Sequence, residues 1–123
     1  MRYLNEKDLR DVGLNWNDTI DAIEDAVVCL DMKDFAQPVK PYLRYRNPAN
    51  RIIAMPAFVG GKVNLSGIKW IASFPGNIDN AIPRAHAVVI LNKAETGEPL
   101  SIINTALLSI IRTSSVSGLM IRY

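Results

Sequence analysis

Short apolar runs separated by turn residues fill the middle of this chain and limit what it can fold into. Runs of strand length stand at Arg51–Ala57, Gly67–Phe74, Ala85–Leu91 and Pro99–Ile103. Turn residues lie between them, at Gly60-Gly61, Pro75–Asn77 and Thr96-Gly97. Most of these connections are too short to hold a crossover helix, so neighbouring strands are expected to run antiparallel.

One more strand is expected ahead of these runs, from Lys40 to Arg46. Its residues alternate so that Lys40, Arg44 and Arg46 would share one face of the strand. Asn47–Asn50 has the composition of a turn, and we expect it to join this strand to the next as a hairpin.

Helices are expected on either side of the strand region. The first covers Asn17–Asp31, capped by Asn15 or Asn17. Its apolar residues recur at three- and four-residue steps and so form one stripe: Trp16, Ile20, Ile23, Val27 and Leu30. The second helix is apolar and begins after Asn104 or Thr105. The order helix, four or five strands, helix predicts an α+β domain with a largely antiparallel or mixed sheet.

Composition excludes several classes of protein. The formal net charge is only +2 and the basic residues are scattered, so nucleic acid is not an expected partner. We find no apolar run of bilayer length and no signal peptide, and Cys29 is the single cysteine, so a cytoplasmic protein without a membrane segment is expected. Cys29 is interpreted as a packed side chain, since nothing marks it as an activated nucleophile.

The residues that commonly carry catalysis are few. His86 is the single histidine, which rules out a metal site built on several histidines, and no metal is expected. Because it lies in an apolar strand, a satisfied structural role is favoured for it over catalysis. The chain also lacks a G-x-G-x-x-G phosphate loop.

Two cations stand in unusually apolar surroundings. Lys69 interrupts a run suited to a core strand, and Arg112 directly follows Ile110-Ile111. No acidic residue near them in sequence offers a partner, so a bound anion would compensate their charge. Alternatively, Lys69 emerges from an exposed sheet face, and Arg112 belongs to a solvated helix stripe with Thr105, Ser109 and Val116. Spacing alone leaves both interpretations open.

Five short motifs occur in an order that resembles the ornithine cyclodeaminase and mu-crystallin family. They are Met55-Pro56-Ala57, Gly67-Ile68-Lys69, Pro75-Gly76-Asn77, Thr96-Gly97-Glu98-Pro99-Leu100, and Leu107-Leu108 through Ile111-Arg112-Thr113-Ser114-Ser115. Each motif is weak alone, but the ordered set covers most of the chain.

The resemblance implies an enzyme of two domains. Residues 1–123 would be the N-terminal substrate-binding and dimerisation domain, and a Rossmann domain absent from this segment would hold most of an NAD cofactor. The expected partners are a small amino-acid substrate and a second copy of the chain. By itself, the segment is expected to self-associate, to bind no NAD and to be inactive.

The resemblance also assigns residues. In the family, two arginines and a lysine hold the substrate carboxylate, and Arg44, Lys69 and Arg112 match those places. Lys69 would also be the candidate for proton transfer. Thr113 resembles a position near the cofactor phosphate.

The motifs around Met55 and Lys69 resemble most closely the branch that makes 2,3-diaminopropionate for siderophores. Members of that branch oxidise N-(2-amino-2-carboxyethyl)-L-glutamate with NAD, and hydrolysis then releases 2-oxoglutarate and L-2,3-diaminopropionate. Three further cations, Lys40, Arg46 and Arg84, are candidate contacts to the additional carboxylates of that substrate, or else solvated surface residues. Cyclisation of ornithine to proline, mu-crystallin-like ligand binding without catalysis, and a pure pairing module remain the alternatives.

Overall fold

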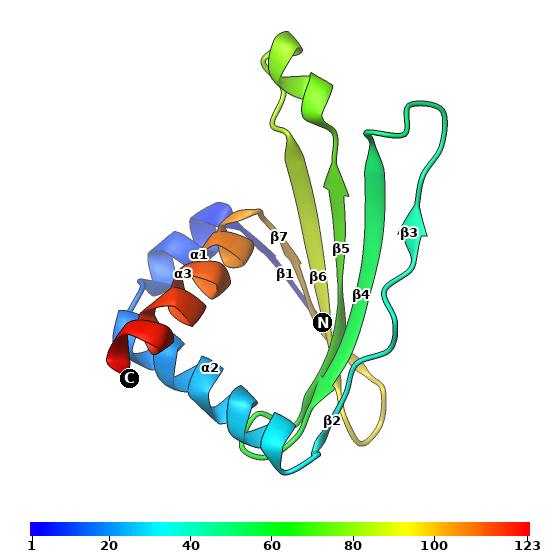
Figure 1. Cartoon of the computed structure of the whole chain (residues 1–123). Coiled ribbons are helices and arrows are strands. Elements are labelled where there is room, and N and C mark those ends of the chain that lie inside the picture. The colour runs from blue at the N-terminus through cyan, green and yellow to red at the C-terminus, as the bar shows by residue number, and fades with distance from the viewer.

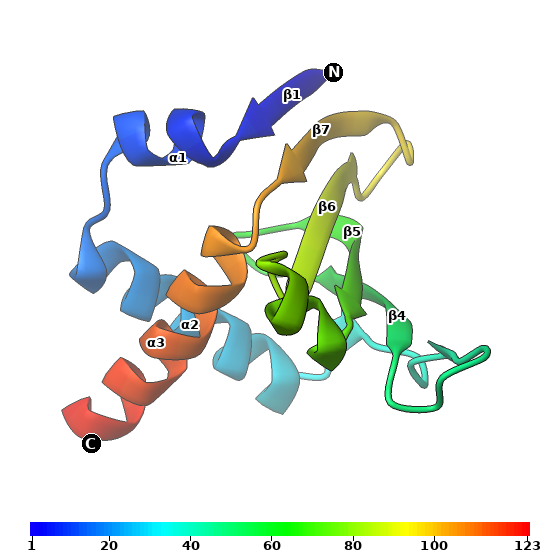
Figure 2. The same cartoon turned by 90° about the horizontal axis from the view of Figure 1, so that it is seen from above.

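The chain forms a seven-stranded sheet with its helices on one side, as a computed structural model of residues 1–123 shows (Figures 1 and 2). In chain order its elements are β1 (Arg2–Asn5), α1 (Glu6–Val12), α2 (Trp16–Asp31), β2 (Phe35–Ala36), β3 (Tyr42–Leu43), β4 (Arg51–Val59), β5 (Leu65–Ser73), the 3-10 helix η1 (Pro75–Asn80), β6 (Ala85–Lys93), β7 (Pro99–Asn104) and α3 (Leu107–Arg122). The predicted α+β class is confirmed.

The sheet is antiparallel except at one edge. Its strand order is β1-β7-β6-β5-β4-β2, with β3 also paired to β4, and β1 runs parallel to β7. The long strands β4, β5 and β6 pair along their full lengths, which places Met55 opposite Lys69 and Lys69 opposite Val89. The four strand runs predicted from turn spacing are all present, each with boundaries shifted by no more than two residues.

Both predicted helices are confirmed, and polar side chains mark their starts. The Asn15 side chain caps α2 by accepting hydrogen bonds from the backbone N–H groups of Asn17 and Asp18. At the start of α3, the N–H of Leu107 donates to the Thr105 hydroxyl at 3.0 Å.

The strand expected from Lys40 to Arg46 is wrong in its extent. Only Tyr42–Leu43 pairs with β4. The chain then turns early: Arg46 has a positive φ of 54°, and the Asn47 side chain accepts a hydrogen bond from the N–H of Ala49. Alternation therefore stops, and the three cations of this segment do not share a strand face.

The N-terminal elements were not predicted. β1 has only four residues and pairs with β7 from the far end of the chain. The short α1 then begins at a capping box in which Asn5 and Asp8 each accept a hydrogen bond from the other's backbone N–H. A strand of four residues is too short to show a periodic pattern, and its partner lies at the other end of the chain, so the sequence did not indicate β1.

Small residues let α3 pack closely on α2. Ser115 is only 1% exposed. A Cβ on Gly118 would lie 2.7 Å from Ile20 Cδ1, so a larger residue there would require the Ile20 side chain to move. Arg122 closes the far end of the pair by binding Asp21 at 2.7 Å. The two helices therefore stabilise each other and leave much of the sheet face below them open.

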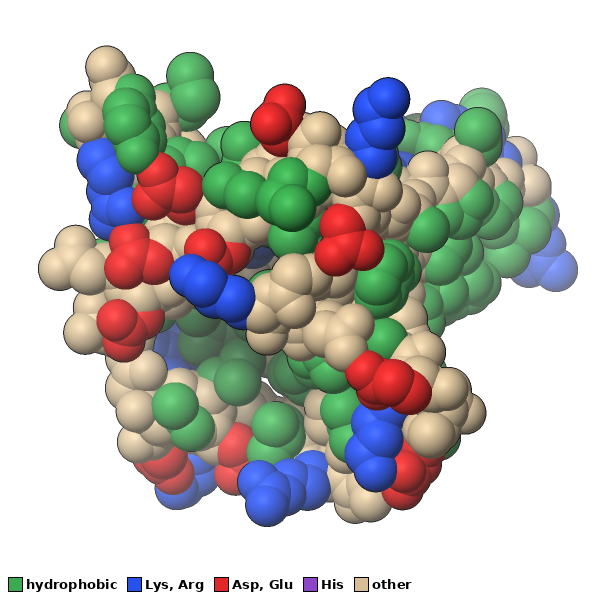
Figure 3. All heavy atoms as spheres, turned by 90° about the horizontal axis from the view of Figure 1, so that it is seen from below, with side chains coloured by type: hydrophobic (Ala, Val, Ile, Leu, Met, Phe, Trp, Pro, Cys, Tyr) green, Lys and Arg blue, Asp and Glu red, His purple; other side chains and the backbone are tan.

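Successive residues of β4, β5 and β6 point to opposite faces of the sheet. The inner face looks toward α2 and α3, whereas the outer face carries no helix (Figure 1). The outer face is largely apolar and includes Ile52, Pro56, Phe58, Ile68, Trp70, Val88, Ile90 and Ile102. Figure 3 shows, from below, a hollow near the middle of the molecule and a broad hydrophobic region on the side of the sheet away from the helices.

Few side chains are fully buried in this single chain. Cys29 is among them at 5% exposure, in agreement with its predicted packed role. His86 differs from expectation: it is exposed, makes no hydrogen bond through its ring, and alternates with Ala87 so that it lies on the outer face. None of the helices is long and apolar enough to cross a membrane.

Candidate functional site

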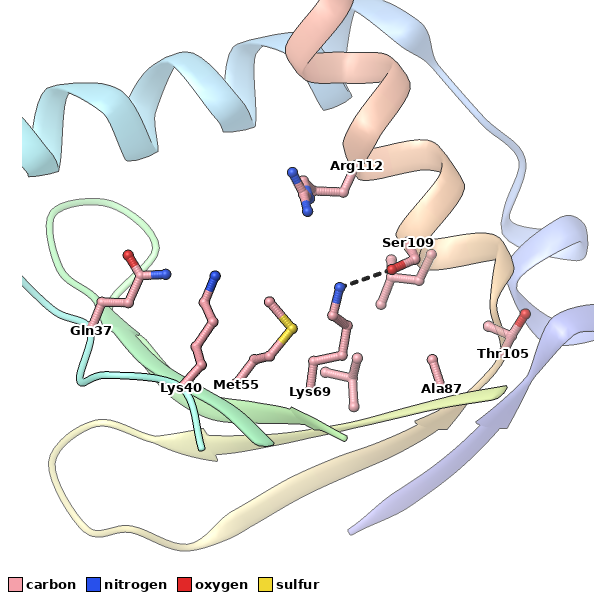
Figure 4. Close-up of a pocket in the computed structure, with 10 residues that line it drawn as sticks. Gln37, Lys40, Met55, Lys69, Ala87, Thr105, Ser109 and Arg112 are labelled. Carbon is pink, nitrogen blue, oxygen red and sulfur yellow. Dashed lines mark hydrogen bonds between the residues drawn. The ribbon is translucent and has the colours of Figure 1, made fainter. Parts of the chain in front are cut away.

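A cleft of about 390 Å³ opens between α3, the inner face of the sheet and the segment that follows β2 (Figure 4). Its walls come from parts of the chain that are far apart in sequence. The ten lining residues are Gln37, Lys40, Met55, Lys69, Ala87, Val89, Thr105, Leu108, Ser109 and Arg112.

Lys69 stands at the centre of the floor. It is the middle residue of β5, flanked by Met55 on β4 and Val89 on β6, so its side chain rises from the inner face between two apolar neighbours. Its Nζ donates a hydrogen bond to Ser109 Oγ at 3.0 Å. Burial, and then the positive charges of Arg112 and Lys40, lower the pKa of Lys69 from its ordinary value of 10.5.

A close backbone approach precedes this lysine. A Cβ on Gly67 would lie 2.4 Å from the carbonyl oxygen of Ile90, nearer than a side chain can come. Only glycine therefore fits the strand pairing at that position. The Gly67-Ile68-Lys69 motif thus combines a packing requirement with a charged side chain that lines the cleft.

The roof of the cleft is one face of α3. Thr105 lies just before α3, and Ser109 and Arg112 lie on it. Their spacing of four and three residues places all three on the side that faces the cleft. The sequence left open whether this stripe is solvated. In the structure Thr105, Ser109 and Arg112 line the cleft, and Figure 4 shows Arg112 and Ser109 projecting over it, although Arg112 and Val116 are also exposed to solvent.

The third wall is an extended segment between β2 and β3. It brings Gln37 and Lys40 to the cleft, on the side away from Thr105 (Figure 4). Pro38 and Pro41 restrict its backbone, and the carbonyl of Pro41 accepts a hydrogen bond from the N–H of Ala54 at 3.3 Å. Sequence reasoning missed Gln37, because no periodic pattern marks an irregular segment.

The cleft carries positive charge without a counterion from the chain. Lys40, Lys69 and Arg112 line it, and none of the lining residues is acidic. None of these three cations takes part in any of the ion pairs of the chain. An anion with more than one charged group would therefore satisfy the site, since Lys69 uses only one of its three N–H donors, on Ser109, and the side chains of Lys40 and Arg112 make no hydrogen bond.

The other predicted site residues lie outside the cleft. Arg44 is exposed; its Nη1 donates to the carbonyl of Pro48 at 2.8 Å, and its guanidinium carbon lies 5.6 Å from the centre of the Tyr42 ring. Arg46 and Arg84 are exposed. Thr113 is also exposed.

The hydroxyl of Thr113 donates to the backbone carbonyl of Ser109 at 2.8 Å. The structure thus brings together Lys40, Lys69 and Arg112 of the predicted set.

Residues of this chain do not form a Rossmann-type dinucleotide site, because no strand leads through a G-x-G-x-x-G turn into a helix. No group of three or more His, Cys, Asp or Glu side chains could hold a metal ion.

The inner face of the sheet and the helix above it thus form a cationic cleft that faces no carboxylate of the chain. Comparison with known proteins identifies the lineage of this domain. The model of the ornithine cyclodeaminase/mu-crystallin family matches residues 7–123, and the chain belongs to that family.

Most of its relatives are named as dehydrogenases or reductases. The chain is 42% identical to N-((2S)-2-amino-2-carboxyethyl)-L-glutamate dehydrogenase of Staphylococcus aureus, covering 95% of this chain and 37% of that protein. It is 32% identical to alanine dehydrogenase of Archaeoglobus fulgidus, covering 89% of this chain and 33% of that protein.

A solved archaeal alanine dehydrogenase dimer with bound NAD matches with a TM-score of 0.85 at 28% identity, over 96% of this chain and 35% of that one. The chain thus spans about a third of the length of these relatives.

Proposed function

We propose that this chain is the N-terminal substrate-binding and dimerisation domain of an NAD-dependent dehydrogenase that oxidatively cleaves N-(2-amino-2-carboxyethyl)-L-glutamate. The observation that carries the proposal is the cleft in which Lys40, Lys69 and Arg112 face no carboxylate of the chain. A substrate with three carboxylates supplies the missing negative charge. The 42% identity to the Staphylococcus aureus enzyme supports the same substrate.

Within this assignment, Lys69 and Arg112 hold the carboxylate beside the carbon that is oxidised. One cation rises from the sheet and the other descends from α3, so a planar carboxylate between them is fixed from two sides. Lys40 on the opposite wall receives a second carboxylate. Arg44 lies outside the cleft, with Nη1 bonded to the carbonyl of Pro48, so it is the weaker third candidate.

The overall reaction is an oxidation followed by a hydrolysis. The carbon–nitrogen bond at the glutamate α-carbon becomes an imine, and water then releases 2-oxoglutarate and L-2,3-diaminopropionate, a building block of siderophores. NAD, held by the remainder of the full-length protein, supplies the hydride acceptor. Lys69 is the chain's candidate for proton transfer, because its amine is half-buried and its pKa is lowered.

We also propose that the outer face of the sheet pairs with a second copy of the chain. Trp70 is 46% exposed there, amid the other apolar side chains of β4, β5 and β6. A contiguous apolar surface of this kind is typical of a subunit interface. The relative of known structure that was described as a dimer supports a homodimer.

The test of the substrate is an assay of the full-length enzyme for NADH formation. The adduct, L-ornithine and L-alanine are offered separately at equal concentrations with NAD. We expect NADH, 2-oxoglutarate and 2,3-diaminopropionate from the adduct alone. Conversion of ornithine to proline and ammonia without turnover of the adduct would contradict the assignment, as would tight binding of an uncharged ligand without any turnover.

A further inference from the structure

Ser109 occupies a position in the cleft that neither the charge pattern nor the family motifs single out. It lies on α3 one turn before Arg112 and accepts the hydrogen bond from Lys69. It is thus the one side chain that links the cation of the sheet to the helix that carries the other cation. Figure 4 shows the bond crossing the cleft between the two walls.

The hydroxyl of Ser109 differs from those of two other serines on the same helix, Ser115 and Ser117. Ser115 donates its hydroxyl proton to the carbonyl of Ile111, and Ser117 donates to the carbonyl of Thr113. Ser109 makes no such bond to the preceding turn; its oxygen is an acceptor for Lys69 alone. Since a hydroxyl can accept and donate at once, the proton of Ser109 is left for a group in the cleft.

Lys69 gains its orientation from this contact. The other charged groups that line the cleft around it are Arg112 on α3 and Lys40 on the extended segment, and both repel it. Thr105 and Gln37 are the remaining polar lining residues, and neither is bonded to Lys69. Without Ser109 the ammonium group would have no acceptor in the chain.

We propose, on the basis of the function proposed above, that Ser109 is a further substrate-binding residue which bridges Lys69 and the carboxylate. Its oxygen accepts from the Lys69 ammonium group, and its hydroxyl proton is donated to a carboxylate oxygen of the substrate. The carboxylate is then held by three donors from two walls: Lys69, Ser109 and Arg112. The hydroxyl also fixes the ammonium group where the carboxylate enters.

The test uses the full-length enzyme with Ser109→Ala, Ser109→Thr and the matched control Ser114→Ala. Ser114 is exposed on α3 outside the cleft, so its change to alanine alters the same helix without touching the site. Alanine favours helix more than serine does, so loss of α3 is not expected in either variant. We expect Ser109→Ala to raise KM for the carboxylate substrate about tenfold, because a hydrogen bond to a charged group is lost. Ser109→Thr should retain most of the affinity.

A second measurement does not depend on which substrate the enzyme uses. Competitive acetylation of the ligand-free enzyme with acetic anhydride, followed by mass spectrometry, gives the reactivity of Lys69 as a function of pH. The lost acceptor had favoured the charged ammonium group, so Ser109→Ala should shift the Lys69 profile to lower pH, whereas Ser109→Thr and Ser114→Ala should not.

The outcomes separate the two proposals. If the wild-type enzyme fails to oxidise the adduct, the proposed substrate is wrong, and the acetylation profile still reports on Ser109. A Lys69 profile in Ser109→Ala that superimposes on that of the wild type would overturn the role of Ser109. So would a shifted profile with an unchanged KM for the substrate that the enzyme does use.

Discussion

The two faces of one sheet carry different surfaces, and adjacent residues serve each of them. Lys69 points to the inner face and lines a cationic cleft, while Trp70, the next residue, points to the outer face among apolar side chains. The alternation of a β-strand makes this division possible without any additional element. A shift of one residue in strand pairing would exchange the two surfaces and destroy both.

The largest effect is expected on the outer face. Trp70→Glu should weaken self-association of the full-length protein by about 4 kcal/mol or more, because it buries an unpaired charge and a two-fold interface contains the change twice. Sedimentation equilibrium measures the dissociation constant. Trp16→Glu is the matched control, since Trp16 is equally exposed but lies on α2. Equal effects of the two changes would disprove the assigned interface.

On the inner face, Arg112→Ala should lower kcat/KM for the carboxylate substrate roughly 100-fold, or about 3 kcal/mol, because one partner of a charged hydrogen-bonded pair is lost. Steady-state kinetics with varied substrate measures it. Arg10→Ala serves as the control, since Arg10 lies on α1 and its side chain bonds only to Glu6. An unchanged kcat/KM in Arg112→Ala would remove this residue from the site.

Substrate binding on the inner face should depend on pH, whereas self-association through the outer face should not. The pKa of Lys69 in the folded protein lies below 10.5, and a bound carboxylate favours its ammonium form. Affinity for the substrate should therefore fall as pH rises through that lowered pKa, by up to about tenfold per pH unit. Self-association through the outer face should not follow this titration. Calorimetric titration at a series of pH values measures the binding.

The variant Lys69→Arg supplies the control. Its guanidinium stays charged, so the fall in affinity with rising pH should disappear.

The lowered pKa of Lys69 also affects stability. Between the folded pKa and 10.5 the unfolded chain binds more protons at this residue, so the free energy of unfolding should rise with pH there. A decline over that window in the wild type, absent from Lys69→Arg, would contradict the lowered pKa.

The smallest expected effect concerns substrate choice. Lys40→Gln should reduce kcat/KM for the adduct about fivefold, or ~1 kcal/mol, since Lys40 contributes one partly exposed ion pair. It should leave the oxidation of a substrate with one carboxylate unaffected. Lys33→Gln is a control at an exposed lysine outside the cleft. The measurement is kcat/KM of each variant with the adduct and with a substrate that has one carboxylate.

Local patterns predicted the parts of the fold that repeat along the chain. The apolar stripe of α2, the turn-separated strands and the isolated cation Lys69 within an apolar run were all recognisable. Distant pairing was not: β1 was missed because its partner β7 lies at the other end of the chain. The alternation of Arg44 and Arg46 suggested a shared face, but a positive φ at Arg46 ends the pattern.

The candidate site was predictable only in part. Lys69 and Arg112 stood out as charges in apolar sequence, and the family resemblance, rather than the spacing, made them candidates for binding a carboxylate. Gln37 and Ser109 carry no charge, and their contribution depends on which walls the tertiary structure brings together. Polar neutral residues of this kind become visible only once the cleft is formed.

The extended segment from Gln37 to Pro41 suggests how the substrate specificity of such a domain can change. It lies at the border of the sheet and is anchored to β4 through the carbonyl of Pro41, whereas Lys69 and Arg112 belong to the central strand and the long helix. Under the proposed function, mutations in these few residues would alter which distal group of the substrate is accepted, while Lys69 and Arg112 would still bind its carboxylate. Substitutions in this segment, in evolution or by design, could therefore diversify the substrates while the sheet and α3 stay unchanged.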